Sequence, residues 1–167
     1  MKKILLMMLM VSRICFAGKI PIELEYAKTE QQQTLGLMQR KELGTNQGML
    51  FIYPKAEVHR IWMFNCFIDL SVAFLDDHLR IREIHELKAY PEMMDPKRPV
   101  LTLEDISLYP PSDPIFKFFM QQSVQSSVKT SYVLEMNAKW FYNHRVTVGD
   151  QLIFNENSAE AYILQKE

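Results

Sequence analysis

Apolar and polar residues alternate strictly over residues 19–26. Apolar side chains occupy every second position from Ile20 to Tyr26, and lysine, proline and glutamate fill the positions around them. A period of two is typical of a β-strand with one buried face, and Pro21 favours a strand start or a sheet edge. These residues are therefore predicted to form a half-buried strand.

The same alternation recurs over residues 128–137 and predicts another half-buried strand. Residues 49–53 are a continuous apolar run closed by proline, as expected of a strand covered on both faces. Residues 80–86 fit a helix about as well as a strand, and the polar turn before them favours a strand. Further strands are expected at residues 58–65, 70–75 and 159–164, with residues 146–154 leading into the last of these.

Two helices are marked by their first residues. Thr29 and Gln32 form a capping-box pair, and the helix that they begin should run to about Arg40. Asp113 and Pro114 suit the cap and the first position of a second helix, which should end at about residue 125.

A third short helix is expected between Asn137, which can cap it, and His144. Many short strands with only two or three short helices are typical of a mainly β protein. We therefore expect a β-sandwich or jelly-roll-like fold, or a partly open barrel.

The first 17 residues have the layout of a secretory signal peptide. Two lysines precede an unbroken apolar run over residues 4–11, and Ala17 is a small residue at the expected cleavage point. The run is far shorter than the ~20 residues that a membrane span needs. The alternative is an uncleaved anchor, which the late Arg13 favours. We expect export to the periplasm or secretion, with residues 18–167 as a single β-rich domain.

Residues 88–127 have a different character, because prolines interrupt the segment repeatedly. We interpret it as a Pro-rich insertion that contains the second predicted helix. Its aromatic run at residues 116–120 suits a helix docked on the core. The alternative is an apolar patch presented to a protein partner.

The charge balance narrows the class of partner. Removing residues 1–17 leaves 16 basic and 20 acidic side chains, a formal charge of −4. An acidic chain without a basic cluster does not suit nucleic acid, because phosphate binding needs concentrated lysine and arginine. No later apolar stretch is long enough to cross a bilayer, so no transmembrane segment is expected after cleavage. Cys66 is then the only cysteine, which rules out an intrachain disulfide.

The common catalytic signatures are missing from the sequence. It contains no His-Glu-x-x-His, Cys-x-x-Cys, Gly-rich phosphate loop or Gly-x-Ser-x-Gly motif. The four histidines lie far apart without the spacing of metal ligands, so neither a metal nor a cofactor is expected. Cys66 is read as a small buried side chain rather than a nucleophile, because free cysteine is commonly buried and inert.

Several short motifs place polar residues beside apolar ones, and together they resemble the bacterial and archaeal family known as domain of unknown function 192. In chain order they are Gly36-Leu37-Met38-Gln39-Arg40, Gly48-Met49-Leu50-Phe51, Trp62-Met63-Phe64-Asn65, Phe74-Leu75-Asp76, Tyr132-Val133-Leu134-Glu135-Met136-Asn137-Ala138 and Val148-Gly149-Asp150. Each motif is weak alone, but the ordered set is specific and covers roughly residues 20–155.

The resemblance implies a compact β fold, often made as an exported protein, with no established activity. Three positions depart from the family pattern: Phe64 stands where the family has lysine, Cys66 where it has threonine, and Asp69-Leu70-Ser71 where it has Pro-Leu-Asp. If those polar positions serve a ligand in relatives, the site is altered here. Residues 88–127 are also longer than the family's usual connection.

The sequence favours an uncharacterised exported protein that acts as a non-catalytic periplasmic or secreted binding or accessory module, for an unknown small molecule or an envelope protein. Its candidate ligand pocket combines an aromatic ring with convergent polar groups. The candidate residues are Arg40, Trp62, Asn65, Glu135 and Asn137.

Each polar candidate also has a structural explanation. Arg40 could pair with Glu135, Asn65 could tie its own turn, and Asn137 could cap a helix. Two other functions stay open: an envelope-associated hydrolase acting on carbohydrate or peptide, and a protein-interaction module built on residues 88–127.

Overall fold

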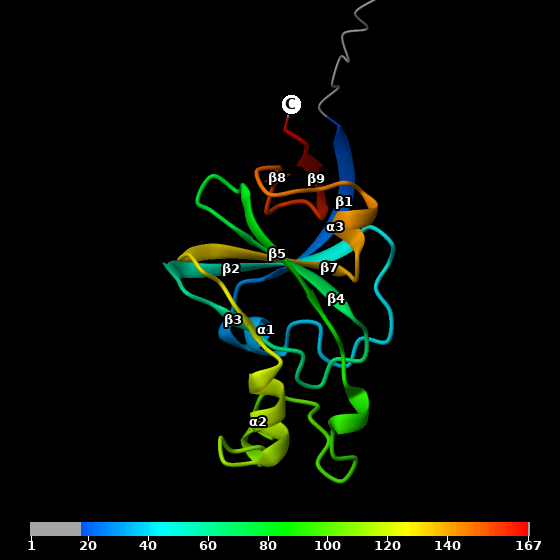
Figure 1. The fold of residues 1–167 in the computed structure, drawn as a ribbon, viewed down its shortest axis with the longest axis vertical. Helices are drawn as coiled ribbons and strands as arrows, with labels where there is room; N and C mark the ends of the chain where they lie inside the picture. Colours follow the sequence, from blue (N-terminus) through cyan, green and yellow to red (C-terminus); the bar gives the residue numbers. More distant parts are fainter. Residues whose placement is uncertain (1–17, 167) are drawn as a thin grey trace, which may run out of the picture.

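Seven strands form one strongly curved sheet in the computed structural model, which describes residues 18–166 (Figure 1). Their order across the sheet is β5-β4-β7-β2-β1-β9-β8, and neighbours run antiparallel except for the parallel pair β1 and β2. The strands are β1 (Lys19–Ala27), β2 (Gln47–Glu57), β4 (Leu70–Leu75), β5 (Ile81–Leu87), β7 (Thr130–Asn137), β8 (Gln151–Phe154) and β9 (Glu160–Leu164).

The two outer strands of the sheet meet at one end. Arg80, just before β5, forms an isolated antiparallel bridge with Gln151 of β8. The backbone N–H of Ile81 donates to the carbonyl oxygen of Asp150 at 2.8 Å. The sheet is therefore curled and joined at one end only, which confirms the prediction of a mainly β protein of the partly open barrel type.

The central strands are buried on both faces. All six residues of β4 are buried. Its alternate side chains enter two separate apolar clusters: Ala73 and Leu75 face the one inside the curve of the sheet, whereas Val72 and Phe74 face the one outside it. Strand β7 follows the same pattern, so the prediction of a half-buried strand at residues 128–137 is wrong there. The outer face of β7 is covered by other parts of the chain.

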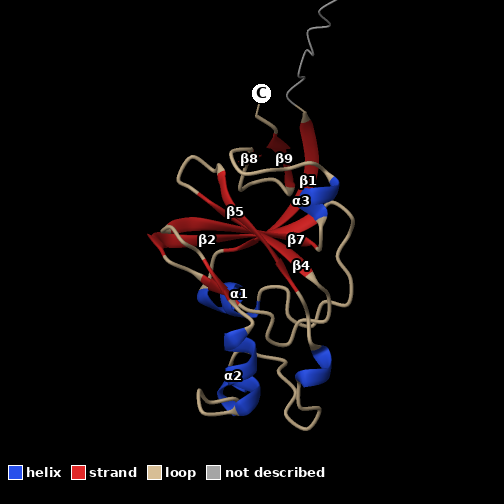
Figure 2. Ribbon diagram, in the orientation of Figure 1, coloured by secondary structure: helices blue, strands red, loops and turns tan. Residues whose placement is uncertain are grey.

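A two-stranded ribbon and one short helix pack against the outside of the sheet, whereas the helix that carries Trp140 and Phe141 packs into the cluster inside the curve (Figure 2). The ribbon joins β3 (Arg60–Ile61) and β6 (Val124–Gln125). The helices are α1 (Glu30–Leu35), α2 (Pro114–Gln121) and α3 (Trp140–Asn143), with 3₁₀ turns η1 (Pro91–Met93) and η2 (Glu104–Leu108). Within residues 18–166 no helix has the length and apolarity required to cross a bilayer. The predicted signal peptide lies outside the described residues.

Helix α1 begins as predicted, with a capping box between Thr29 and Gln32, but it ends at Leu35 rather than near Arg40. Gly36 ends it with φ of +47°, a conformation that favours glycine. A Cβ atom at Gly36 would also lie 3.1 Å from the ring of Phe51. The chain therefore turns sharply here and passes over the sheet.

Two other element predictions are corrected. The strand expected at residues 58–65 is reduced to the two residues of β3, because residues 62–69 form turns that lead into β4. Helix α3 is present, but the side chain of Asn137 does not cap it; the capping position is Lys139, with φ of +61°.

Residues 88–127 project from one end of the barrel and include α2, which begins at Pro114 as predicted but ends at Gln121 rather than near residue 125 (Figure 1). Asp113 caps α2 by accepting a hydrogen bond from the Ile115 N–H at 2.7 Å. The insertion has its own apolar cluster, in which Phe64 meets Tyr109 and Phe119 edge to face at 5.1 and 5.4 Å. The aromatic run of α2 is thus docked on the protein through the fully buried Phe119.

Replacing Gly48 by alanine should destabilise the fold by about 2 kcal/mol, because overpacking a tight site costs about 1–3 kcal/mol. A Cβ atom there would lie 2.6 Å from the Glu135 carbonyl oxygen and would press on the Met136 sulfur. Gly44→Ala is the control, since its Cβ would meet only the flexible Gln47 side chain. Urea unfolding should show the larger loss for Gly48→Ala, and equal losses would contradict the close approach of β2 and β7.

Candidate functional site

A cavity of about 340 Å³ opens on the outer face of the sheet. Its walls come from α1 and the turn after it, from the end of β2, and from the segment that contains β3. Strand β7 contributes one residue, Glu135. The polar and aromatic residues that line the cavity are Glu30, Gln33, Thr34, Phe51, Tyr53, His59, Arg60, Trp62, Cys66 and Glu135.

Glu135 projects from the middle of the sheet into an apolar environment. Its neighbours on the adjoining strands are Met49 of β2 and Val72 of β4, both buried. Alternation along β7 puts Glu135 on the same face as Val133, which belongs to the outer apolar cluster. The residue is 5% exposed.

The Glu135 carboxyl has no hydrogen-bond or ion-pair partner among residues 18–166. Every side-chain nitrogen or oxygen that is fully shielded from solvent in this part of the chain does have a partner. The carboxyl therefore keeps a small contact with solvent, and the cavity that it lines is the route to it. Burial without a counter-charge raises the pKa of Glu135 to about 8.

Two aromatic rings, those of Tyr53 and His59, form part of the cavity wall. The Tyr53 ring stacks on the His59 ring with centroids 3.6 Å apart, and His59 Nε2 lies 2.9 Å from the Thr130 carbonyl oxygen. Burial raises the pKa of Tyr53, and the charge of Glu135 adds to this effect. Burial lowers the pKa of His59. Both rings are therefore uncharged at neutral pH.

Trp62 lines another part of the cavity. Its ring stacks on Phe64 at 4.8 Å and meets the edge of Phe116 at 5.4 Å. Phe116 belongs to α2, so the insertion takes part in holding this wall in place. The cavity is thus bounded in part by a residue whose position depends on residues 88–127.

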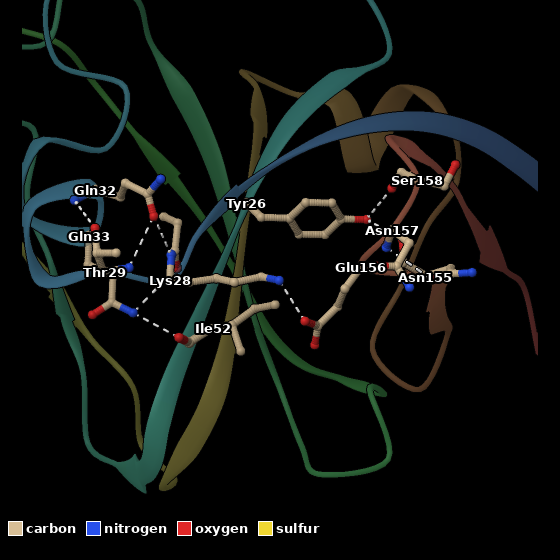
Figure 3. Close-up of polar contacts among 11 residues, drawn as sticks. Tyr26, Lys28, Thr29, Gln32, Gln33, Ile52, Asn155, Glu156, Asn157 and Ser158 are labelled. Atoms are coloured by element: carbon tan, nitrogen blue, oxygen red, sulfur yellow. Dashed lines mark hydrogen bonds and ion pairs between the residues drawn. The ribbon is translucent and has the colours of Figure 1, made fainter.

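Helix α1 forms a third wall and is fastened at several points (Figure 3). The Gln33 amide, which also lines the cavity, donates to the Ile52 carbonyl oxygen at 2.8 Å and to that of Ala27 at 3.3 Å. Lys28, just before the helix, pairs with Glu156 at 2.6 Å. The Gln33 contacts tie α1 to β1 and β2, and the Lys28 pair ties the residues before the helix to the turn between β8 and β9.

Cys66 also lines the cavity. Burial raises the pKa of its thiol, and the charge of Glu135 raises it further. The side chain is 6% exposed, and its sulfur lies 3.7 Å from the Phe64 carbonyl oxygen as a weak donor. A thiol with a raised pKa is a poor nucleophile at neutral pH.

The structure brings together two of the five predicted site residues, Trp62 and Glu135. Arg40 lies elsewhere and pairs with Glu25 at 2.5 Å on the surface, so the expected Arg40–Glu135 pair is wrong. The pair does not form because α1 ends early and the chain turns away at Gly36.

The other two predicted residues, Asn65 and Asn137, hold distant segments of the chain together through hydrogen bonds. Asn65 donates to the Val100 carbonyl oxygen at 2.8 Å, which ties the insertion to the turn after β3. Asn137 donates to the Gly44 and Leu43 carbonyl oxygens at 2.8 and 3.1 Å. Neither side chain lines the cavity around Glu135.

Sequence reasoning missed Tyr53 and His59. The alternation of Met49, Phe51 and Tyr53 on one face of a strand was the available signal for the tyrosine. His59 carried no signal, because only folding places its ring on Tyr53. In the described part of the chain, no three histidine, cysteine, aspartate or glutamate side chains gather closely enough to hold a metal ion.

The family model of domain of unknown function 192 (DUF192), described as an uncharacterized ACR, matches residues 13–107. The chain belongs to the DUF192 family. The matched segment contains α1, Tyr53, His59 and Trp62 but stops before Glu135 on β7. No curated protein matches this DUF192 chain.

Two solved structures share the fold. A protein of unknown function from Novosphingobium aromaticivorans is 24% identical with a TM-score of 0.60; the match covers 81% of this chain and 77% of that one. A protein from Sinorhizobium meliloti, described as a candidate transcription regulator, is 22% identical with a TM-score of 0.57, covering 81% of this chain and 92% of that one. These likenesses establish the fold and nothing about activity.

Stability should fall as pH rises from about 5 to 8, and the Glu135→Gln variant should lack this part of the dependence. The folded protein keeps a proton on Glu135 up to about pH 8, whereas the unfolded chain releases it near its ordinary value of 4.5. The slope from this group approaches about 1.4 kcal/mol per pH unit.

Urea unfolding of both proteins at pH 5.5, 7 and 8.5 measures the effect, and the difference between them isolates Glu135. The contribution of His59 is common to both proteins and cancels. Parallel stability curves for the two proteins would mean that the Glu135 carboxyl is not buried as described.

Proposed function

We propose that the chain is an exported, non-catalytic binding module that takes a small ligand in the cavity beside Glu135. The observation that carries the proposal is the buried Glu135 carboxyl, which has no partner among residues 18–166 and lines a cavity with aromatic walls. Small-molecule sites are usually concave and apolar with a few convergent polar groups.

The energetic cost of this arrangement supports a functional role. A buried polar group without a hydrogen bond costs about 1–3 kcal/mol, a cost that an apolar residue at position 135 would avoid. The aromatic pair of Tyr53 and His59 and the ring of Trp62 line the opening through which the carboxyl keeps its small contact with solvent. A ligand that completes its hydrogen bonds would recover the cost.

Export is supported by the sequence of residues 1–17, with their basic start, short apolar run and small residue at position 17. Release of the exported protein from the membrane depends on cleavage after residue 17. The chain expressed in bacteria with a C-terminal tag should appear in the periplasm or the medium, with Gly18 as its first residue by N-terminal sequencing. A cytoplasmic protein that begins at residue 1 or 2 would contradict export.

The binding proposal is tested by thermal unfolding of residues 18–167 against a panel of sugars, peptidoglycan fragments, amines, nucleotides and metals. A ligand at a hundred times its dissociation constant stabilises the fold by about 2.7 kcal/mol. At roughly 2–4 °C per kcal/mol, the midpoint should rise by several degrees.

Two variants make the result specific to the cavity. Glu135→Gln and Trp62→Leu should reduce the shift, whereas Arg40→Gln should leave it unchanged, because Arg40 lies in an exposed pair with Glu25. A flat panel with folded protein would overturn the binding function. An equal loss in all three variants would place the site elsewhere.

A second candidate, a hydrolase of envelope carbohydrate or peptide, is favoured by one observation. Glu30, His59 and Glu135 line the same cavity, and a carboxyl with a raised pKa suits general acid catalysis. Hydrolysis of a substrate by the wild-type protein, abolished in Glu135→Gln and retained in Arg40→Gln, would replace the binding proposal with this one.

A further inference from the structure

The charged side chains that line the cavity differ in whether other residues already bind them. Arg60 is the cationic residue among those that line it, and its guanidinium donates to Ser123 Oγ at 2.8 Å and to Gln125 outside the cavity. Glu30 stands exposed at the rim, and Glu135 lies at the base. The base of the cavity thus carries an acidic group without a cationic neighbour in contact.

Aromatic rings line the same cavity as that group. Phe51 and Tyr53 stack with centroids 6.3 Å apart, and Trp62 lines the same cavity. Aromatic rings attract cations, most strongly when the cation is desolvated. An acidic group at the base and aromatic rings around it form the usual surroundings of a bound ammonium.

We propose that the ligand of this cavity carries a positively charged amine, whose nitrogen is held by Glu135 beside the rings of Tyr53 and Trp62. This inference rests on the proposed binding function and assigns its ligand class. A cationic amine gives the carboxyl the counter-charge that residues 18–166 do not provide. An anionic ligand would instead meet Glu135 and Glu30.

Binding of a cation has a consequence for protons. At pH 7 most molecules hold a proton on Glu135, because its pKa is about 8. A permanently charged amine selects the ionised carboxylate, so binding releases a proton below pH 8 and none well above it. The affinity should therefore rise about tenfold between pH 7 and pH 9.

The other shifted groups at the cavity do not produce this dependence. The pKa of His59 is lowered from its ordinary 6.5, and those of Tyr53 and Cys66 are raised from 10.0 and 9.0, so all three keep one protonation state over the window. The remaining charged groups at the cavity are Glu30 and Arg60.

The test compares choline with 3,3-dimethylbutan-1-ol, a neutral molecule of the same shape, by isothermal titration calorimetry on residues 18–167. Choline carries its charge at every pH used. We expect choline to bind about tenfold more tightly at pH 9 than at pH 7, with release of about 0.9 proton at pH 7. The neutral alcohol should bind at least tenfold more weakly than choline at pH 9, without pH dependence.

Variants separate the contributions of the two parts of the site. Glu135→Gln should abolish both the pH dependence and the proton release, and Trp62→Leu should weaken choline while keeping the proton release. Arg40→Gln should behave as the wild type. Ethanolamine serves as a primary amine in the same series at pH 8, in case the three methyl groups of choline do not fit.

The outcomes distinguish this inference from the proposed function. Equal binding of choline and the neutral alcohol, or binding that Glu135→Gln leaves intact, overturns the amine assignment and keeps a binding module. The same holds if neither choline nor ethanolamine binds while another member of the thermal panel does. If nothing in either set binds, the proposed function fails together with the inference.

Discussion

The central strands β4, β7 and β2 are packed on both faces, and the rest of the structure depends on this double burial. One face fills the inside of the partly open barrel, and the other needs a cover from outside the sheet. Helix α1, the turns after β3 and the insertion supply that cover. Because each is short, these segments depend on packing against the sheet and on hydrogen bonds such as those of Gln33 and Asn65 for their positions.

A carboxyl on such a strand is exceptional. Glu135 stands between Met49 and Val72 on the covered face, where an ionised group loses its hydration. The cover is incomplete above it, since Tyr53, His59 and Trp62 surround an opening rather than close it. The raised pKa of Glu135 and the unused hydrogen-bonding capacity of its carboxyl both follow from this one placement.

Phe64, one position at which the chain departs from the pattern expected of the family, has a clear structural role. Phe64 is fully buried and connects Trp62 with the insertion through Tyr109 and Phe119. A lysine there would place a charge in that apolar cluster. Phe64 and residues 88–127 therefore belong to one packing unit, which helps to hold one wall of the cavity.

The sequence by itself determined the mainly β class, the strands with clear alternation, the capping box of Thr29 and the start of α2 at Pro114, because these depend on neighbours along the chain. It also singled out Trp62 and Glu135. Only the tertiary structure decided that Glu135 is buried without Arg40 as its partner, and that Tyr53 and His59 stand beside it. Those facts depend on where α1 stops and on which segments cover the outer face of β7, and contacts between residues far apart in the chain leave no periodic trace in the sequence.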